Sequence, residues 1–295
     1  MKMSSPSAFE HIVIATHPNI PQACEKAAQI ATFLEDRGIV AMHGSLYDES
    51  LRTIVKEKGD LLIALGGDGT MLRAGHLCAP HHVPILGINI GKLGFLIEFK
   101  HNEWEDALTK VLAGAYWLEN RMMLQAEQWR DEQKLGSWVV LNEVVVSRGR
   151  ILRPVHLHTS VEGHFLTTYV ADGLIAATPT GATAYALAAG GPILPPELRN
   201  ILLVPVAPHL SIDRAIVLPQ GSSVSITVHT EHQAIISMDG QEPIAMEDGD
   251  SVNVRASDHV TQFVRTQDPG YFYRNISPQM YNNYPAIKTN YDRNS

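Results

Sequence analysis

The sequence predicts an α/β protein with a second part built mostly from β-strands. Three observations lead to this prediction. The first third alternates buried strand patterns with amphipathic helix patterns, many short strand patterns follow it, and a glycine-rich turn comes directly after one early strand. Strands that alternate with helices form parallel sheets covered on both faces, whereas many short strands in series form sandwiches or barrels.

Residues 1–115 contain the predicted elements of the α/β part. Short apolar runs predict strands at 11–16, 39–42, 60–65 and 84–90. Apolar residues recur at helical spacing in three further segments, 21–37, 70–77 and 103–112. The pattern changes near Ala115, and we therefore expect the first domain to end there.

Residues 116–265 form the predicted β-rich domain. Short apolar segments there are broken by turns that contain Gly, Pro or Asn. The predicted strands are 138–147, 155–160, 167–170, 174–177, 201–206, 215–218, 224–229, 234–238 and 251–255. One helix, at 183–189, interrupts them. The polar, Tyr-rich segment 266–295 is predicted to be a C-terminal tail that docks on the body.

Composition excludes several classes of protein. The chain has 295 residues, 45% of them hydrophobic, and a net charge of −8, which disfavours nucleic acid and anionic membranes as partners. No apolar run reaches the roughly 18 residues of a membrane span. The two cysteines fit neither a disulfide framework nor a metal site, and the histidines lack zinc-ligand spacing. We expect a cytoplasmic protein without a metal held by its own side chains.

The strongest local signal is the GGDGT sequence at residues 66–70, between a predicted strand and a predicted helix. Ligands of open parallel sheets bind beyond the carboxyl ends of the strands, and glycines let backbone N–H groups approach phosphate oxygens. Asp68 could accept a proton from a substrate hydroxyl or help to hold a nucleotide-bound magnesium ion. A tight turn with an exposed aspartate is the alternative reading. The sequence contains neither G-x-x-x-x-G-K-[ST] nor an early G-x-G-x-x-G.

Other polar residues have both a functional and a structural interpretation. Asn142 and Glu143 are neighbours on a predicted strand, so both can contact one ligand only at a strand end or bulge. The alternative is a polar pair on an edge strand. Thr183 is either an anion-binding helix start or a simple N-cap. Arg73 and Arg153 are either phosphate contacts or solvated surface cations. For Tyr185 the alternative is a packed aromatic, and for the Asp239-Gly240 pair a hairpin turn.

Several motifs, taken together, resemble the NAD kinases. GGDGT alone is also similar to diacylglycerol and sphingosine kinases and, more distantly, to phosphofructokinases. The further segments run in the order of the NAD kinase family: 87–96 (GINIGKLGFL), 141–144 (LNEV), 171–173 (ADG), 178–185 (TPTGATAY), 189–193 (AGGPI), 208–209 with Arg214, and 239–241 (DGQ). The combination is much more specific than GGDGT alone.

The resemblance implies that the protein transfers the γ-phosphoryl group of ATP, with Mg²⁺, to the adenosine-ribose 2′-hydroxyl of NAD, which gives NADP. Polyphosphate is an alternative donor. The implied architecture is an N-terminal Rossmann-like domain and a C-terminal β-sandwich-like domain with the active site between them. A homo-oligomer, either a dimer or a tetramer, is also implied.

Family positions carry over residue by residue. Asp68 corresponds to the catalytic proton acceptor, and the phosphate loop is formed by Gly66, Gly67, Gly69 and Thr70. The implied NAD-binding residues are Asp68, Gly69, Arg73, Asn142, Glu143, Arg153, Asp172, Thr183, Ala184, Tyr185, Ala188 and Gln241. Two other functions stay open at this point, namely a lipid kinase that shares GGDGT and a sensor that binds NAD without turnover.

Overall fold

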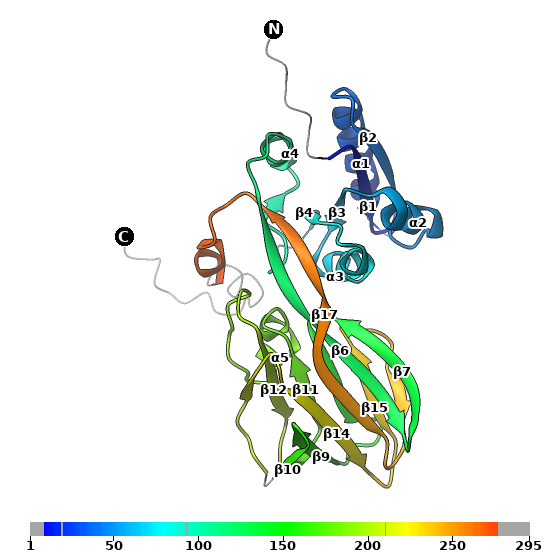
Figure 1. Cartoon of the computed structure of the whole chain (residues 1–295), viewed down its shortest axis with the longest axis vertical. Coiled ribbons are helices and arrows are strands. Elements are labelled where there is room, and N and C mark those ends of the chain that lie inside the picture. The colour runs from blue at the N-terminus through cyan, green and yellow to red at the C-terminus, as the bar shows by residue number, and fades with distance from the viewer. Residues whose placement is uncertain (1–8, 19, 92–93, 210, 277–295) are drawn as a thin grey trace, which may run out of the picture. The chain divides into compact units, whose positions relative to one another are not determined.

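The computed structural model describes residues 9–18, 20–91, 94–209 and 211–276, which form two compact units (Figure 1). The first unit contains the chain up to Ala74, residues Val83–Glu119 and the chain from Phe263 onward. The second contains Gly75–His82 and Asn120–Gln262. The domain boundaries expected after residues 115 and 265 stay sequence-based predictions.

The first unit is built around a parallel sheet. Its strand order is β2 (Val40–Ser45), β1 (His11–Thr16), β3 (Leu61–Gly66) and β4 (Ile85–Asn89), and the short β5 (Phe99–Lys100) runs parallel to β4. Every residue of β3 and β4 is buried, so both faces of the sheet are covered, as expected for parallel strands. The predicted parallel α/β architecture is thereby confirmed.

Helices cover this sheet. They are α1 (Pro21–Glu35), α2 (Glu49–Lys58), α3 (Asp68–Cys78), which continues into the 3₁₀ turn η1 (Ala79–His81), and α4 (Trp104–Leu112). The apolar faces of α1 and α4 share one core cluster with β1, β3 and β4. The sequence analysis missed α2, in which only Leu51 and Val55 are buried. Among the described residues, no helix combines the length and apolar character needed to cross a membrane.

The second unit is a sandwich of antiparallel strands. One sheet has the order β13 (Ile216–Pro219), β12 (Asn200–Val206), β11 (Gly173–Ala177), β8 (Glu143–Arg148), β15 (Ala234–Met238) and β16 (Ile244–Met246). The other contains β10 (His164–Ala171), β9 (Val155–Val161), β14 (Ser223–His229), β17 (Ser251–Arg265), β6 (Trp117–Arg130) and β7 (Gln133–Val140). Apolar residues from both sheets form one core, and this confirms the predicted sandwich-like domain.

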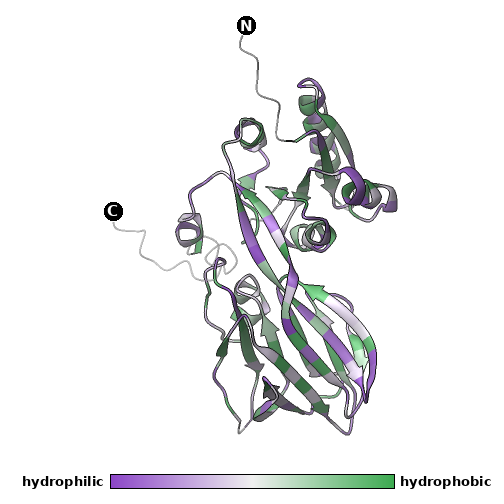
Figure 2. Ribbon diagram, in the orientation of Figure 1, coloured by the Kyte–Doolittle hydropathy of each residue, from purple (hydrophilic) through white to green (hydrophobic). Residues whose placement is uncertain are grey.

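Three sequence-based element predictions were wrong in detail. The strand expected at 138–147 is two strands, β7 and β8, interrupted at Leu141 and Asn142. Two long strands were missed wholly or in part: β6 was not predicted, and β17 runs to Arg265 instead of ending at 255. Figure 2 shows hydrophilic and hydrophobic residues mixed along both strands. In β6 three polar residues (119–121) precede three apolar ones (122–124), so the strict alternation that predicts a half-buried strand is missing. The helix expected at 183–189 is the 3₁₀ turn η2 (Gly181–Thr183) followed by α5 (Tyr185–Ala188).

A buried ion pair joins distant parts of the first unit. Arg265, which is 1% exposed, donates from Nε to Glu119 Oε2 at 2.9 Å and from Nη1 to the Leu96 carbonyl at 3.0 Å. The Tyr271 hydroxyl donates to Glu119 Oε1 at 2.9 Å, and Glu98 Oε1 accepts the backbone N–H of Gln267 at 2.9 Å. The chain just after β17 is therefore part of the polar interior of this unit. Residues 277–295 of the predicted tail lie outside the described residues.

Replacing the buried Tyr271 with phenylalanine tests the importance of this network. Tyr271→Phe leaves Glu119 with one hydrogen bond fewer in a buried site, and we expect a loss of about 1–3 kcal/mol in the free energy of unfolding. Tyr47→Phe removes the same atom from a residue that is 51% exposed and should change stability by less than about 0.5 kcal/mol. Urea denaturation of both variants measures the difference, and equal effects would contradict the prediction.

Candidate active site

The glycine-rich turn lies at the carboxyl end of β3, where the chain enters α3. The helix begins at Asp68 itself, two residues earlier than expected from the sequence. The Asp68 carboxylate accepts the backbone N–H of Phe95 at 2.8 Å and that of Leu96 at 3.1 Å, both from the chain after β4. A Cβ atom on Gly94 would lie about 2.1 Å from an Asp68 oxygen, so only glycine fits there. Asp68 is therefore a half-buried carboxylate whose orientation is fixed by backbone amides.

The remaining residues of this turn differ in accessibility. Thr70 is 4% exposed, and its side chain occupies the space beside Gly66, where a Cβ atom would come within 2.2 Å of Thr70 Oγ1. A Cβ atom on Gly67 would meet nothing within 4 Å. Gly69 is exposed, as is Arg73, whose Nη1 lies 3.5 Å from the Gly69 carbonyl oxygen. A phosphate could thus approach the backbone at Gly67 and Gly69, whereas Thr70 faces the interior.

One buried carboxylate, that of Asp239, bonds to the backbone of residues 141–143, which are the two residues between β7 and β8 and the first residue of β8. Asp239 accepts the backbone N–H of Leu141 at 2.7 Å, of Asn142 at 2.8 Å and of Glu143 at 2.9 Å. Its side chain is 1% exposed, and Oδ2 lies 2.6 Å from Nε2 of His76. Asn142 and Glu143 thus lie at a strand break and a strand start, the geometry that a shared ligand requires.

The predicted 178–185 segment is tied to the same strand break. The Thr178 hydroxyl donates to the Leu141 carbonyl at 2.6 Å, and its backbone N–H donates to the Asn142 carbonyl at 2.8 Å. Gly181 packs against the backbone of Asn142 so closely that a Cβ atom would lie 2.2 Å from its carbonyl oxygen. Residues 141–143 and 178–181 therefore form one rigid substructure within the second unit.

The residues that follow are more open. Tyr185 is 45% exposed, so it is not the packed aromatic of the structural reading, and Ala188 is exposed as well. The Thr183 hydroxyl donates to the Thr180 carbonyl at 3.0 Å and caps no helix, so the N-cap reading does not apply. The Ala184 N–H is used in the 3₁₀ turn, where it donates to the Gly181 carbonyl at 2.9 Å. Tyr185 and Ala188 are thus available to a ligand.

Asp172 and Arg153 lie elsewhere in the second unit. Asp172 accepts a hydrogen bond from Nε of Arg148 at 2.7 Å. Arg153 is exposed and lines a cavity of about 580 Å³ together with three histidines, His156, His229 and His232. In the part of the chain that the structure describes, no three His, Cys, Asp or Glu side chains are grouped so that they could hold a metal ion.

Burial perturbs the acidity of Glu143. The side chain is 5% exposed, and its Oε2 atom has no hydrogen-bond partner in the described structure. Burial, and to a lesser degree the negative charge of Asp239, raise the pKa of Glu143 to about 8. At neutral pH this carboxyl group is therefore mostly protonated, and it can both donate and accept a hydrogen bond.

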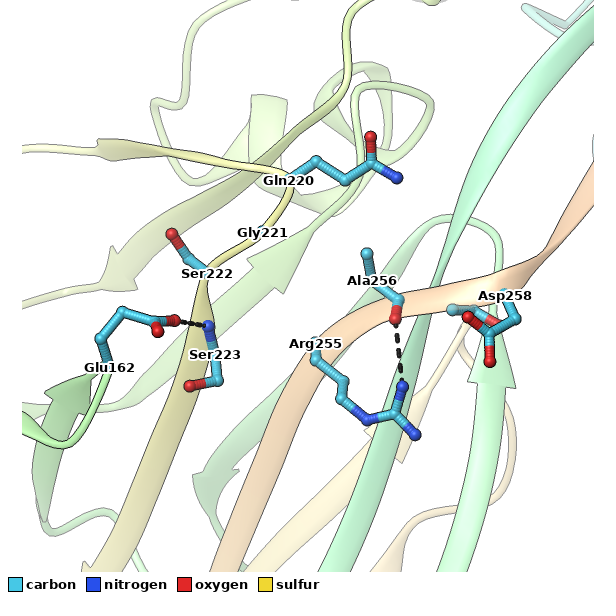
Figure 3. A pocket seen from close by; sticks show the side chains of 9 residues that line it. Glu162, Gln220, Gly221, Ser222, Ser223, Arg255, Ala256 and Asp258 are labelled. Carbon is cyan, nitrogen blue, oxygen red and sulfur yellow. Dashed lines mark hydrogen bonds between the residues drawn. The ribbon is translucent and has the colours of Figure 1, made fainter.

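Two further cavities differ in their relation to these residues. A cavity of about 320 Å³ is bordered by Gln241 and His76 and has apolar walls that include Met123, Trp138 and Met238. A cavity of about 540 Å³ lies between the 220–223 turn and β17 and contains none of the predicted residues (Figure 3). Glu162 there accepts the Ser223 N–H, and Arg255 turns back to the Ala256 carbonyl at 3.4 Å. Two charged groups of this cavity, those of Glu162 and Arg255, are thus already bonded to backbone.

Comparison with protein families assigns both halves of the chain. Residues 12–116 match the ATP-NAD kinase N-terminal domain, and residues 141–266 match the ATP-NAD kinase C-terminal domain. The chain belongs to the NAD kinase family. The resemblance seen in the sequence motifs is therefore confirmed, and the chain is a phosphotransferase of this family.

Relatives and solved structures agree with the assignment. An NAD kinase of Chloroflexus aggregans is 39% identical over 91% of this chain and 97% of its own, and one of Dehalococcoides mccartyi is 36% identical over 97% and 100%. A crystal structure of yeast NADH kinase complexed with NADH has a TM-score of 0.82 at 24% identity, covering 92% of this chain and 88% of that one. An Archaeoglobus fulgidus NAD kinase in complex with ATP has a TM-score of 0.75 at 23% identity, covering 92% and 99%. The two structures show that the fold is shared.

Sequence reasoning missed the two residues that organise residues 141–143 in this NAD kinase family member. The histidines, His76 among them, were considered only as metal ligands, and Asp239 as part of the DGQ motif or as a hairpin residue, with no role assigned to its side chain. Asp239 does occupy a hairpin turn, with φ +48°, but its side chain bonds to a segment almost a hundred residues earlier in the chain. The DGQ motif was the available signal, although no local pattern indicates which backbone amides Asp239 contacts.

The raised pKa of Glu143 predicts a characteristic pH dependence. Its ordinary value is 4.5, so between about pH 4.5 and pH 8 the folded protein keeps a proton that the unfolded chain releases, and this costs stability as pH rises. We expect the stability of Glu143→Gln relative to wild type to increase by on the order of 4 kcal/mol from pH 5 to pH 9. Urea denaturation at both pH values gives the difference.

The exposed Glu105 provides the control, because Glu105→Gln makes the same substitution on a surface helix. Its stability relative to wild type should vary by less than about 0.5 kcal/mol over that pH range. A Glu143→Gln difference that is equally flat would show that Glu143 is ionised normally.

Proposed function

We propose that this protein catalyses the ATP-dependent phosphorylation of NAD at the adenosine-ribose 2′-hydroxyl and releases NADP and ADP. The observation that carries the proposal is the Asp68 carboxylate, fixed by the amides of Phe95 and Leu96 at the end of β3, in a chain of which both halves match ATP-NAD kinase domains. Neither a lipid kinase nor an NAD sensor is supported by these comparisons.

Asp68 acts on the substrate hydroxyl in this proposal. Phosphoryl transfer requires that the attacking oxygen be placed in line with the γ-phosphorus, and a carboxylate can orient the hydroxyl and accept its proton. The two amide bonds fix the carboxylate before the substrate arrives, so little reorganisation accompanies the transfer. The backbone at the partly exposed Gly67 and the exposed Gly69 is available to phosphate oxygens at the start of α3.

The second unit supplies the dinucleotide contacts. Asn142 and Glu143 bind the adenosine ribose, and the protonated Glu143 can donate a hydrogen bond to a ribose oxygen at neutral pH. The remaining dinucleotide contacts are assigned to the second-unit residues Arg153, Asp172, Thr183, Ala184, Tyr185, Ala188 and Gln241. Tyr185, which is nearly half exposed, can stack on a planar ring. Arg73, on α3, is a secondary phosphate contact.

In this proposal magnesium binds together with ATP, and the described residues contain no cluster of side chains that could hold it alone. Bound to the phosphates of ATP, it would neutralise charge on the transferred group. The family descriptions name ATP, and we therefore favour ATP over polyphosphate as the donor. We further propose a cytoplasmic homo-oligomer that uses small molecules and neither nucleic acid nor membrane as partners.

The direct test mixes purified protein, MgATP and NAD and detects NADP with an NADP-specific dehydrogenase. Production of NADP supports the proposal, and replacing ATP by polyphosphate identifies the donor. Diacylglycerol offered as the acceptor tests the lipid kinase alternative. Calorimetric binding of NAD without any ATP consumption would favour the sensor instead.

Replacing the Asp68 carboxylate tests its catalytic role. We expect Asp68→Asn to lower turnover by about 10²- to 10⁴-fold while the protein stays folded, which is the range for loss of a general base. Asp60→Asn is a matched control, since Asp60 also accepts two backbone N–H groups, from Glu10 and His11, away from the glycine-rich turn. Its turnover should stay within about threefold of wild type.

Steady-state kinetics with circular dichroism to confirm folding measure both variants. Near-normal turnover of Asp68→Asn would remove Asp68 from the proposed role. Partial recovery of this variant at high magnesium concentration would instead indicate that Asp68 acts by binding the metal.

A further inference from the structure

Asp239 bonds to a part of the chain that is distant in sequence. Most turn aspartates bond to their own turn. Here the local hairpin is closed by other groups: the Ser237 hydroxyl donates to the Gln241 carbonyl at 2.9 Å, and the Gln241 N–H donates to the Met238 carbonyl at 2.9 Å. The local turn thus does not use the Asp239 carboxylate, which accepts hydrogen bonds from residues 141–143 instead.

Those residues need an acceptor because the β-ladder stops there. Three successive backbone N–H groups, those of Leu141, Asn142 and Glu143, point at one place, and buried N–H groups without acceptors are costly. Both Asp239 oxygens satisfy them, Oδ2 at Leu141 and Oδ1 at the other two. In return the Glu143 carbonyl accepts the Asp239 N–H at 3.0 Å. The strand break is therefore a bonded arrangement with one defined shape.

His76 completes the surroundings of the carboxylate. Its Nε2 lies 2.6 Å from Asp239 Oδ2, and its Nδ1 lies 3.4 Å from Nε2 of Gln241. With the three amides this gives the carboxylate four donors, which a 1% exposed charge requires. The imidazole thus bonds to Oδ2 of Asp239, the same oxygen that accepts the Leu141 N–H.

We propose that Asp239, held by His76, is the positioning residue that sets Asn142 and Glu143 in the geometry that binds NAD. The inference rests on the proposed function, in which residues at the strand break bind NAD. Asp239 does not contact NAD in this proposal. It acts through the backbone of residues 141–143, and the Thr178 bonds to Leu141 and Asn142 extend its effect to the 178–181 segment.

The conservative variant Asp239→Asn separates positioning from simple stability. An asparagine offers one acceptor oxygen, and its NH₂ group would face a backbone N–H, so at least one of the three amide bonds is lost. We expect the dissociation constant for NAD, measured by calorimetry on the full chain, to rise about 10- to 100-fold. The KM for ATP should stay within about threefold, and kcat should fall less than NAD affinity does.

Asp250 supplies a matched control for buried acids. It is fully buried in the same unit and is bonded to Arg130 Nε at 2.8 Å and to the Glu247 N–H at 2.9 Å. Asp250→Asn should lower the thermal midpoint yet leave NAD affinity within about threefold of wild type. Equal losses of NAD affinity in the Asp239→Asn and Asp250→Asn variants would overturn the proposal, because general destabilisation would then explain both.

If Asp239→Asn does not fold, the NAD affinity of His76→Gln provides a second test of the proposal. This change disturbs the imidazole contact and keeps the three amide bonds, and we expect a smaller rise in the NAD dissociation constant, about 3- to 10-fold. The proposal would be overturned if a folded Asp239→Asn variant bound NAD as strongly as wild type. If that variant is unfolded, wild-type NAD affinity of His76→Gln would overturn it.

Amide hydrogen exchange tests the positioning role of Asp239 independently of the proposed function. Exchange of peptides that contain residues 141–143 needs no NAD, and it should become faster in Asp239→Asn and stay unchanged in Asp250→Asn. A wild-type protein that neither binds nor phosphorylates NAD would refute the proposed function, whereas unchanged exchange in Asp239→Asn would refute the positioning role alone.

Discussion

A carboxylate that accepts backbone N–H groups is the interaction on which the candidate site depends. Among the candidate site residues it is made by Asp68 in the first unit and by Asp239 in the second. In both cases the amides belong to chain that has just left or interrupted a strand, where the regular ladder no longer provides acceptors. The two carboxylates thereby fix irregular segments that would otherwise be free to move, while the strands around them supply the rigid frame.

The two carboxylates nevertheless serve opposite purposes. Asp68 is half-buried at the end of a parallel sheet, and the amides of Phe95 and Leu96 orient an acid that, in the proposed function, itself acts on the substrate. Asp239 is sealed from solvent, and its charge also contributes to the high pKa of Glu143. In the two proposals, chemistry and recognition thus both rely on aspartate–amide contacts, but Asp68 is itself positioned, whereas Asp239 positions its neighbours.

The sequence predicted what depends on local pattern. β3 and β4 were recognisable because both of their faces are buried, and the glycine-rich turn because Gly66 and Gly94 have no room for a side chain. A shared role of Asn142 and Glu143 required a strand end or bulge there, but the cause of the break was not predicted, because it is a side chain almost a hundred residues later. The long strands β6 and β17 mix polar and apolar residues without strict alternation, which weakens the strand signal. Glu143 was found through its motif, but its raised pKa depends on burial that only the folded chain creates.

The bonds made by the chain beyond β17 affect how this protein can be shortened. The family match to the C-terminal domain stops at residue 266, yet Gln267 and Tyr271 bond to Glu98 and Glu119 inside the first unit. A chain cut at the edge of the family match would leave Arg265 and Glu119 without the phenol that covers them. The Leu96 carbonyl accepts a hydrogen bond from Arg265, and the Leu96 N–H donates one to Asp68. Such a cut would therefore also weaken the contacts that hold the proposed catalytic acid in place.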